Sequence, residues 1–498
     1  YYCVNLNIVT MTIWFPKLDE AGGPVYRQIA QAIRKAVKDG SLKPGDRLPT
    51  HRDLAYQLGV TVGTITRSYR EAERLGLVAG EVGRGTYVLD NIQSELDMAA
   101  TAPIPMAFTN NLTQLARSTG TAPSTNSQSN ETEDTGPINF RMNCPLPPRE
   151  GRIRETLIEV ATTMSTDDMV SYKSEYGVAH QREALAFSAG RLGLDDNPER
   201  VLPTAGVQHG MTVSLLATVR PGDLVLCEEL TYPNLRSLAN LLQFRLRGVA
   251  MDDDGIMPDA LENMCRTQSP RAIYLMPTLH NPLCSTMSQK RRIEIAEILR
   301  KYDLTLIEDG IYHFLDPDAP PPLSCFAPER SIYLDGVSKS IGGGLRVGYI
   351  HAPGEMIGKL ASAIRSTCWM VSTINLELVT RMIMDGSLAQ FEAWHREEAA
   401  KRLAIVLGTL KGYDIRFHPT NYHIWLELPE HIDTSELVMD AANNGVLLTA
   451  AQQFAVGHVP RGMRLCFGAE RSPERLRRGV QIVDRLLQSS DFGNSVVM

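Results

Sequence analysis

From about residue 199 onward, the sequence alternates segments typical of buried strands with segments typical of helices. The strand-like runs include DLVLCEE, RAIYLMPT, LTLIED and SIYLDGVSK, and a helical pattern covers residues 288–301. Such alternation indicates an α/β fold with a mainly parallel sheet. Ligands of these sheets bind at the carboxyl ends of the strands, so the polar residues that come after these runs are candidates for a site.

A polar stretch over residues 91–137 divides the chain. It contains 13 Ser or Thr residues, and its segment TGTAPSTNSQSNETEDTGP has no apolar period. Such a segment buries too little apolar surface to repay the entropy of ordering, so we predict a flexible linker. The linker separates a head, residues 16–90, from a body, residues 138–498. Within the body we expect a large domain over about residues 165–385 and a small domain in the C-terminal part.

The head has the pattern of a small winged helix-turn-helix domain. An apolar helical pattern runs from Pro24 to Gly40, and two further helices are predicted to start after Thr50 and Thr61. A helix, a short turn containing Gly and a second helix form the helix-turn-helix pattern. The sequence LVAGEVGRGTYVL then alternates like the two strands of a hairpin, which would be the wing.

The charge distribution and the third helix predict that the head binds double-stranded DNA. Residues 16–89 carry a net charge of +4 and the rest of the chain −11, which give −7 in total. A basic head on an acidic body fits a protein that contacts DNA with one end. Threonines and arginine near the start of the third helix would meet the major groove, and other arginines would hold the backbone or the minor groove. The predicted DNA-contacting residues are Arg52, Thr61, Thr64, Thr66, Arg67 and Arg84. In the alternative interpretation, these residues are only solvated side chains of a small helical domain.

The bulk sequence argues against several classes of protein. No apolar run approaches the ~20 residues that span a bilayer. The opening YYCVNLNIVT has neither the basic start nor the cleavage site of a secretory signal. The eight cysteines are scattered without a CxxC pair, which argues against a zinc site or a disulfide framework. We therefore expect a cytoplasmic protein without a metal site.

Two residues of the body come after strand-like runs and have the chemistry of a covalent cofactor site. Lys339 lies after SIYLD in a glycine-rich stretch and precedes Arg346 by seven residues. A lysine there can hold an aldehyde as a Schiff base, and the arginine can hold a phosphate. Asp309 ends LTLIED, and a buried carboxylate needs a partner such as a protonated pyridine nitrogen. Alternatively, Lys339 is a surface loop lysine, and Asp309 caps a helix or forms an ion pair.

Further candidates lie after the other strand-like runs. Asn281 precedes Pro282 after a strand end, where it could donate to a phenolate oxygen or simply form a turn. Gly206 precedes a helical run whose first amide groups could bind a phosphate. Tyr232 lies just after DLVLCEE and could stack on an aromatic ring.

Both parts of the chain resemble known families. PGDRLPTHRDLA, LGVTVGTITRSYREAERLGLV and VGRGTYV resemble the GntR family of winged-helix regulators over about residues 24–89. The chain departs from that pattern at Val62-Gly63, where many relatives carry an arginine and then a small polar residue. The order and spacing of the body candidates resemble fold-type-I, class I/II aminotransferases over roughly residues 139–485.

The aminotransferase resemblance implies pyridoxal 5'-phosphate as cofactor and assigns a role to each candidate. Lys339 would form the aldimine, Asp309 would pair with the pyridine nitrogen, and Tyr232 would stack on the ring. The ring hydroxyl would be bound by Asn281 and Tyr312. The phosphate would be held by Val207, Gln208, Ser338 and Arg346, with Tyr172 reaching it from the neighbouring subunit. Arg464 would bind a substrate or effector carboxylate. The chain departs from the family at Gly336, where a phosphate-binding Ser or Thr is common, and at Leu283-Cys284, where Thr-Gly is usual.

The combined architecture resembles MocR-type regulators. The resemblance implies a homodimer that binds an operator with two half-sites and senses an amino acid, an amine or a vitamer through the aldimine at Lys339. A dedicated aminotransferase with an accessory head is the alternative, because every residue needed for half a transamination is present. A DNA-binding protein whose body lacks a cofactor would need Lys339 and Asp309 to be coincidences.

Overall fold

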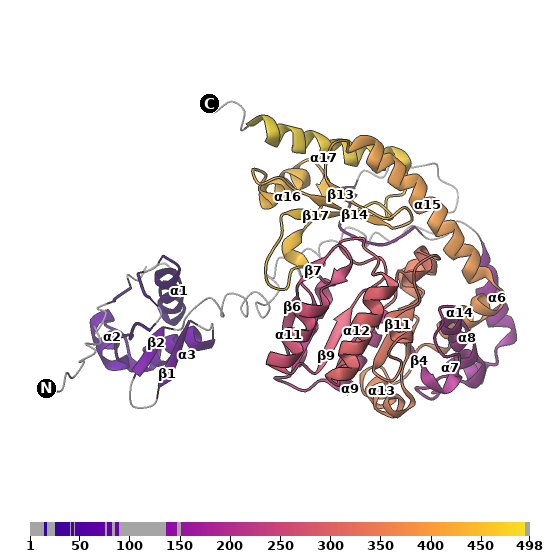
Figure 1. The fold of residues 1–498 in the computed structure, drawn as a ribbon, viewed down its shortest axis with the longest axis horizontal. Coiled ribbons are helices and arrows are strands. Elements are labelled where there is room, and N and C mark those ends of the chain that lie inside the picture. The colour runs from indigo at the N-terminus through magenta and orange to yellow at the C-terminus, as the bar shows by residue number, and fades with distance from the viewer. Residues whose placement is uncertain are drawn as a thin grey trace. The chain divides into compact units, whose positions relative to one another are not determined.

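The computed structural model describes residues 14–16, 25–39, 41–43, 45–74, 77–81, 85–88, 136–146 and 151–493. The chain forms two compact units, residues 1–102 and 103–498, which correspond to the predicted head and body (Figure 1). Nearly all of the predicted linker lies outside the described residues, as do Arg84, Pro24 and Gly40.

The head contains the three predicted helices. They are α1 (Val25–Lys38), α2 (His51–Leu58) and α3 (Val62–Arg74). The Thr50 side chain caps α2 by accepting from the Asp53 N–H, and Gly59 ends α2 in the left-handed region at φ 64°. The Thr61 hydroxyl accepts from the Thr64 N–H at 3.2 Å at the start of α3. The predicted starts of α2 and α3 are therefore confirmed.

An antiparallel hairpin completes the head in the position predicted for the wing. Its strands are β1 (Val78–Glu81) and β2 (Gly85–Val88), and Val78 pairs with Val88. The helices and the hairpin share one apolar core, which includes Ile29, Ile33, Leu48, Leu54, Ile65, Tyr69, Val78 and Val88. The apolar spacing read along the helices thus corresponds to the buried faces.

A seven-stranded sheet organises the body, in the order β4-β12-β11-β10-β9-β5-β6. The strands are β4 (Val201–Thr204), β5 (Leu224–Glu228), β6 (Arg245–Val249), β9 (Ala272–Leu275), β10 (Thr305–Asp309), β11 (Ser331–Gly336) and β12 (Gly348–His351). β12 runs in the direction opposite to that of the other six strands of this sheet. The predicted mainly parallel sheet is confirmed.

Helices cover both faces of this sheet, as Figure 1 shows. The helices α9 (Val207–Thr218), α10 (Pro233–Leu242) and α13 (Gly354–Thr367) share one core, and α11 (Pro258–Gln268) and α12 (Gln289–Lys301) share another. Val225 and Cys227 of β5 point into the first core, whereas Leu224 and Leu226 point into the second. Burial on both faces explains why these strands read as continuous apolar runs rather than as alternating ones.

A group of helices packs beside the β4 edge of the sheet. These helices are α6 (Arg152–Thr163), α7 (Thr166–Val170), α8 (Ala179–Gly190) and α14 (Thr373–Met384). Their core includes Val201 of β4 and Tyr349 of β12. Among the helices that the structure describes, none is long and apolar enough to cross a membrane.

The C-terminal part forms a smaller domain with its own sheet, β13-β14-β17-β16. Its strands are β13 (Ile415–Arg416), β14 (His423–Glu427), β16 (Thr449–Ala450) and β17 (Gly462–Cys466), and its helices are α15 (Ser387–Thr409), α16 (Thr434–Asn443) and α17 (Pro473–Gly493). The short strand β3 (Ile138–Asn139) pairs in parallel with β15 (Val446–Leu447). The first described residues after the predicted linker therefore belong to the C-terminal domain.

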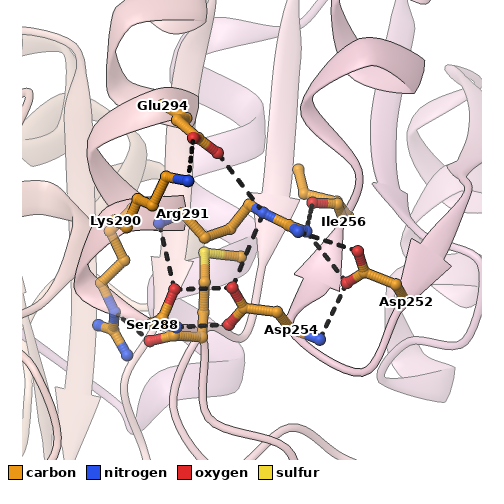
Figure 2. Close-up of polar contacts among 9 residues, drawn as sticks. Asp252, Asp254, Ile256, Ser288, Lys290, Arg291 and Glu294 are labelled. Atoms are coloured by element: carbon orange, nitrogen blue, oxygen red, sulfur yellow. Dashed lines mark hydrogen bonds and ion pairs between the residues drawn. The ribbon is translucent and has the colours of Figure 1, made fainter.

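A polar network fixes the beginning of α12 to the hairpin of β7 (Met251–Asp252) and β8 (Gly255–Ile256), as Figure 2 shows. The Asp254 carboxylate accepts from the Ser288 N–H at 2.6 Å and from its hydroxyl at 2.7 Å. The Arg291 guanidinium forms a bidentate pair with Asp252 at 3.0 and 2.9 Å. Because α12 begins soon after Asn281, this network holds the far end of the loop that carries Asn281.

We predict that Gly310→Ala disturbs the body, because an added Cβ would overlap the ring and hydroxyl of the buried Tyr333. Gly310 comes directly after Asp309, so relief of the overlap must move the end of β10. The variant should yield less soluble protein, with a loss of stability of about 1–3 kcal/mol, typical of overpacking. Thermal unfolding of the full chain measures this.

Gly358→Ala is the matched control, because Gly358 is exposed within α13 and its added Cβ would meet no atom within 4 Å. In a helix interior, Ala is about 1 kcal/mol more favourable than Gly, so this variant should match or exceed the wild type. Equal stability of the two variants would contradict the packing assigned to Gly310.

Candidate functional site

Several predicted body residues lie just past the carboxyl ends of strands of the large sheet, and Arg464 approaches them from the C-terminal domain. A cavity of about 230 Å³ opens there, between the large sheet and the C-terminal domain. Its lining includes the predicted Tyr232, Asn281, Tyr312, Lys339 and Arg464. The other lining residues are Asn139, Arg141, Met142, Asn143, Cys144, Pro233, Asn234, Thr449, Gln453 and Phe454.

Lys339 lies in a single π-helical turn, Ser338–Gly342, just after β11. Its ammonium group donates to the backbone carbonyl of Asn143. Burial is the main influence on this amine and lowers its pKa from the ordinary lysine value. A lower pKa increases the fraction of neutral amine, which is the form that attacks a carbonyl carbon.

Asp309 is the last residue of β10, and its side chain is buried. The Tyr274 hydroxyl donates to one carboxylate oxygen at 2.7 Å, and the Ile311 N–H donates to the other at 3.1 Å. Burial raises the pKa of Asp309, and these two donors oppose the rise. A carboxylate in this position would be stabilised by a cationic ring nitrogen, as predicted.

Arg464 lies on β17 and is buried against the loop that carries Asn281. Its guanidinium donates to the Asn281 side-chain oxygen at 2.7 Å and to the Arg141 carbonyl at 2.7 Å. The guanidinium carbon lies 4.8 Å from the centre of the Phe454 ring. These contacts hold Arg464 in the cavity wall, where it can bind a carboxylate.

The two predicted tyrosines are bound by asparagines that the sequence analysis did not select. The Tyr312 hydroxyl accepts from the Asn143 amide at 2.8 Å. The Tyr232 hydroxyl accepts from the Asn234 amide at 3.0 Å, and burial raises the pKa of Tyr232 to about 12. Both phenols therefore stay protonated near neutral pH and can donate a hydrogen bond.

The predicted phosphate-binding residues gather at the start of α9. Gly206 precedes this helix at φ 80°, and an added Cβ would approach the Arg346 guanidinium to 3.0 Å. Arg346 itself donates to the Ala205 carbonyl at 2.9 Å. Val207 and Gln208 form the first turn of α9, where free amide groups and the helix dipole favour an anion. A fourth predicted residue, Ser338, belongs to the turn that carries Lys339.

Tyr172 does not line the cavity of its own chain. Its side chain is 80% exposed and packs against the Trp369 ring, with 5.6 Å between ring centres. The expectation that it serves a neighbouring subunit remains a prediction.

Of the predicted DNA-contacting residues that the structure describes, Arg52 lies on α2, Thr61 directly precedes α3, and the others lie on α3. Arg52, Thr61 and Arg67 are exposed, and the Arg67 guanidinium lies 4.0 Å from the centre of the Tyr26 ring. Thr64 and Thr66 are half-buried, and the Thr66 hydroxyl donates to the Val62 carbonyl at 3.0 Å. The exposed side chains are thus better placed to reach DNA than the two half-buried threonines.

Comparison with known families accounts for this arrangement. Residues 150–483 match the family model of aminotransferase class I and II. The chain belongs to this family. Residues 25–88 match the bacterial regulatory proteins of the gntR family. This class I and II family member therefore carries a GntR-type helix-turn-helix domain in front of its aminotransferase domain, which is the MocR-type architecture.

Individual relatives agree with the family match. The chain is 29% identical to an uncharacterized HTH-type transcriptional regulator, YdeF of Bacillus subtilis, over 95% of this chain and 96% of the relative. An archaeal alanine:glyoxylate aminotransferase shares the fold with a TM-score of 0.68 and 23% identity, over 78% of this chain and 96% of the other. The α-aminoadipate aminotransferase LysN of Thermus thermophilus was solved with N-(5'-phosphopyridoxyl)-L-leucine. It shares the fold with a TM-score of 0.65 and 24% identity, over 72% of this chain and 94% of the other.

Membership of the aminotransferase class I and II family implies pyridoxal 5'-phosphate as the cofactor. The residues at the site fit this cofactor. Lys339 offers an amine of lowered pKa, and Asp309 offers a buried carboxylate. The Gly206 turn leaves room beside Arg346 that a side chain would fill. The buried side-chain oxygen of Asn143 has no hydrogen-bond partner within the described residues, so it can accept from a ligand.

The sequence analysis did not select three residues that contact predicted site residues. They are Asn143, Asn234 and Tyr274. Asn143 accepts from Lys339 and donates to Tyr312, and Tyr274 donates to Asp309. Tyr274 lies inside the apolar run RAIYLMPT, where only its polarity distinguishes it from core residues. Asn143 lies shortly after the predicted linker, in a segment that the β3–β15 pairing joins to the C-terminal domain.

We predict that Tyr274→Phe weakens pyridoxal phosphate binding. Loss of a hydrogen bond to a charged group costs roughly 1.5–3 kcal/mol, or about tenfold or more in affinity. Because the Tyr274 hydroxyl opposes the rise in the pKa of Asp309, the variant should keep this carboxyl neutral up to a higher pH. On acidification, its cofactor affinity should therefore fall at a higher pH than that of the wild type. Absorbance titration with the cofactor at several pH values measures both effects.

Tyr333→Phe is the control, since the buried Tyr333 hydroxyl has no hydrogen-bond partner among the described residues. Its cofactor affinity should equal that of the wild type. Wild-type affinity in Tyr274→Phe would show that the Tyr274–Asp309 contact does not support the cofactor.

Proposed function

We propose that this chain is a cytoplasmic transcription regulator that binds pyridoxal 5'-phosphate and works as a homodimer. Its heads would bind an operator with two half-sites on double-stranded DNA. Its body would sense a small molecule, either an amino acid, an amine or a vitamer. DNA binding would then depend on the ligand that occupies the body.

One observation carries this proposal: a winged helix-turn-helix head precedes a body in which five of the predicted site residues line one cavity, namely Tyr232, Asn281, Tyr312, Lys339 and Arg464. A recognition helix and a wing have no evident use in amino-group transfer. The B. subtilis relative described as a transcriptional regulator aligns over 95% of this chain, which includes both parts.

The body residues would bind and orient the cofactor and the effector. When bound, pyridoxal phosphate supplies an aldehyde that exchanges amines and a ring that withdraws electrons. Lys339 would hold the aldehyde carbon, Asp309 would keep the proton on the pyridine nitrogen, and Arg346 with the start of α9 would hold the phosphate. An effector amine would compete with the Lys339 amine, while Arg464 would bind the effector carboxylate. The effector changes DNA binding only if its affinity differs between the two conformations of the protein.

A dedicated aminotransferase is the second candidate, because Lys339, Asp309 and Arg464 all reach the same region with intact contacts. The two functions differ in a measurable way. A dedicated aminotransferase would turn over an amino acid and an oxo acid steadily, and ligands would not change its affinity for DNA.

We predict that Lys339→Ala abolishes ligand sensing. The purified variant should lack the visible absorbance that the wild type gains from pyridoxal phosphate, because no lysine amine holds the aldehyde. With a DNA fragment recovered by genomic footprinting, candidate effectors should change the affinity of the wild type but not that of the variant. Gel-shift titrations with and without each effector measure this. An unchanged effector response in Lys339→Ala would refute sensing through this lysine.

We also predict that Arg67→Ala weakens DNA binding without altering cofactor absorbance. Loss of a contact from this exposed arginine should cost about 1–3 kcal/mol, and the salt dependence should become shallower if the contact is to phosphate. Arg34→Ala, on the exposed face of α1, is the charge-matched control and should bind more nearly like the wild type. Equal affinities for the two variants would place the DNA-reading surface elsewhere.

A further inference from the structure

The segment that begins with β3 presents side chains to two different environments. Ile138 and Phe140 point into the core of the C-terminal domain. Asn139 and Arg141 alternate with them and line the cavity, as do the next residues, Met142, Asn143 and Cys144. The alternation over residues 138–141 is expected for extended backbone, in which successive side chains point to opposite sides. The segment therefore places Arg141 at the cavity.

The backbone around Arg141 is firmly held. The Phe140 N–H donates to the Leu447 carbonyl at 2.9 Å, and the Arg141 carbonyl accepts from Arg464 at 2.7 Å. Arg141 thus sits next to the arginine proposed to bind the effector carboxylate, in a defined position.

The guanidinium of Arg141 has no partner among the described residues: no hydrogen bond or ion pair from its side chain is present there. The side chain is half-buried, and burial alone lowers its pKa. A guanidinium remains charged in proteins, so a partly buried one is costly without an anion.

Other buried arginines of the body contrast with Arg141. Arg292 donates to the Met287 and Pro277 carbonyls and to the Thr278 hydroxyl. Arg402 donates to the Glu398 carboxylate and the Phe467 carbonyl. The fold satisfies both of these buried arginines, which makes the unpaired Arg141 unusual within it.

The charges around the cavity indicate what Arg141 is free to bind. Its lining carries three cationic side chains, Lys339, Arg141 and Arg464, and no Asp or Glu among the described residues. Lys339 is assigned to the cofactor aldehyde and Arg464 to one carboxylate. The cofactor phosphate is assigned to Arg346 and the start of α9, neither of which lines this cavity. Arg141 is therefore the cationic side chain of the lining to which no anion has been assigned.

We propose that the effector is an amino acid with a second carboxylate, and that Arg141 binds this second carboxylate while Arg464 binds the first. This inference rests on the proposed function, because it names the ligand class of the same site. Arg141 is then the residue that distinguishes acidic from neutral amino acids. A planar guanidinium can bind a carboxylate through two parallel hydrogen bonds, which provides that selectivity.

The test compares matched ligand pairs on the full-length protein loaded with pyridoxal phosphate. The pairs are L-aspartate with L-asparagine, L-glutamate with L-glutamine, and L-2-aminoadipate with L-norleucine. Calorimetry gives the Kd of each ligand, and the cofactor spectrum gives an independent readout. For at least one pair, the wild type should bind the acid roughly tenfold or more tightly than its neutral partner.

Variants then assign the preference to Arg141. In Arg141→Gln, the ratio of the two Kd values should fall to about one, whereas Arg141→Lys should keep part of the preference because it keeps the charge. Arg220→Gln, at an exposed position remote in sequence from the cavity segment, should keep the wild-type ratio. Cofactor absorbance and the melting temperature establish that each variant is folded and loaded.

The outcomes separate this inference from the proposed function. Equal binding of acid and neutral ligands by the wild type, or a preference that persists in Arg141→Gln, would overturn the role of Arg141. If such ligands still changed DNA affinity, the proposed regulator function would stand. An acid preference that depends on Arg141, without any effect of the ligand on DNA binding, would support the inference and refute the regulator function. A loaded protein that binds none of the six ligands would overturn the inference.

Discussion

The buried carboxylate of Asp309 is the constraint on which the cofactor site depends. Burial favours its neutral form, and among the described residues only the Tyr274 hydroxyl and the Ile311 N–H are hydrogen-bonded to it. A cationic partner would resolve this conflict, and the pyridine nitrogen of the implied cofactor is such a partner. The tight packing of Gly310 against Tyr333 keeps the carboxylate at the end of β10, so the fold holds this group in place before any ligand binds.

The segment 138–144 links the two domains of the body at the same point. Its strand β3 is part of the C-terminal domain, yet the Asn143 carbonyl accepts from Lys339 and the Asn143 amide donates to Tyr312 of the large domain. If Lys339 held the cofactor aldehyde, its amine would give up the first of these contacts, and an effector amine that displaced Lys339 would free that amine again. The segment also begins directly after the predicted linker, so it offers a short covalent route along the chain from the cavity to that linker.

The polar groups of the cavity differ from those of a site for a neutral ligand. Arginines at two positions line it, one anchored by Asn281 and a backbone carbonyl, the other unpaired among the described residues. An enzyme and a sensor can both use such a pair to select a dicarboxylic ligand. The two differ in the step after binding, which is repeated turnover for the enzyme and a shift between two DNA-binding states for the sensor.

The sequence alone determined the α/β body, the winged head, and Lys339 and Asp309 as candidates, because apolar periodicity, caps and residues after strand ends are local features. Thr50 and Gly59, for example, end up capping α2 as their types predict. Arg464 became a candidate only through the family resemblance. Only the tertiary structure decided which distant groups meet. From its sequence context, Tyr274 is a core residue of its strand, and only the pairing of that strand with β10 brings its hydroxyl to Asp309. Arg141 lies at the cavity because β3 pairs with β15. Such contacts join residues separated by tens to hundreds of positions, and no local pattern encodes them, because they arise from the packing of elements against one another.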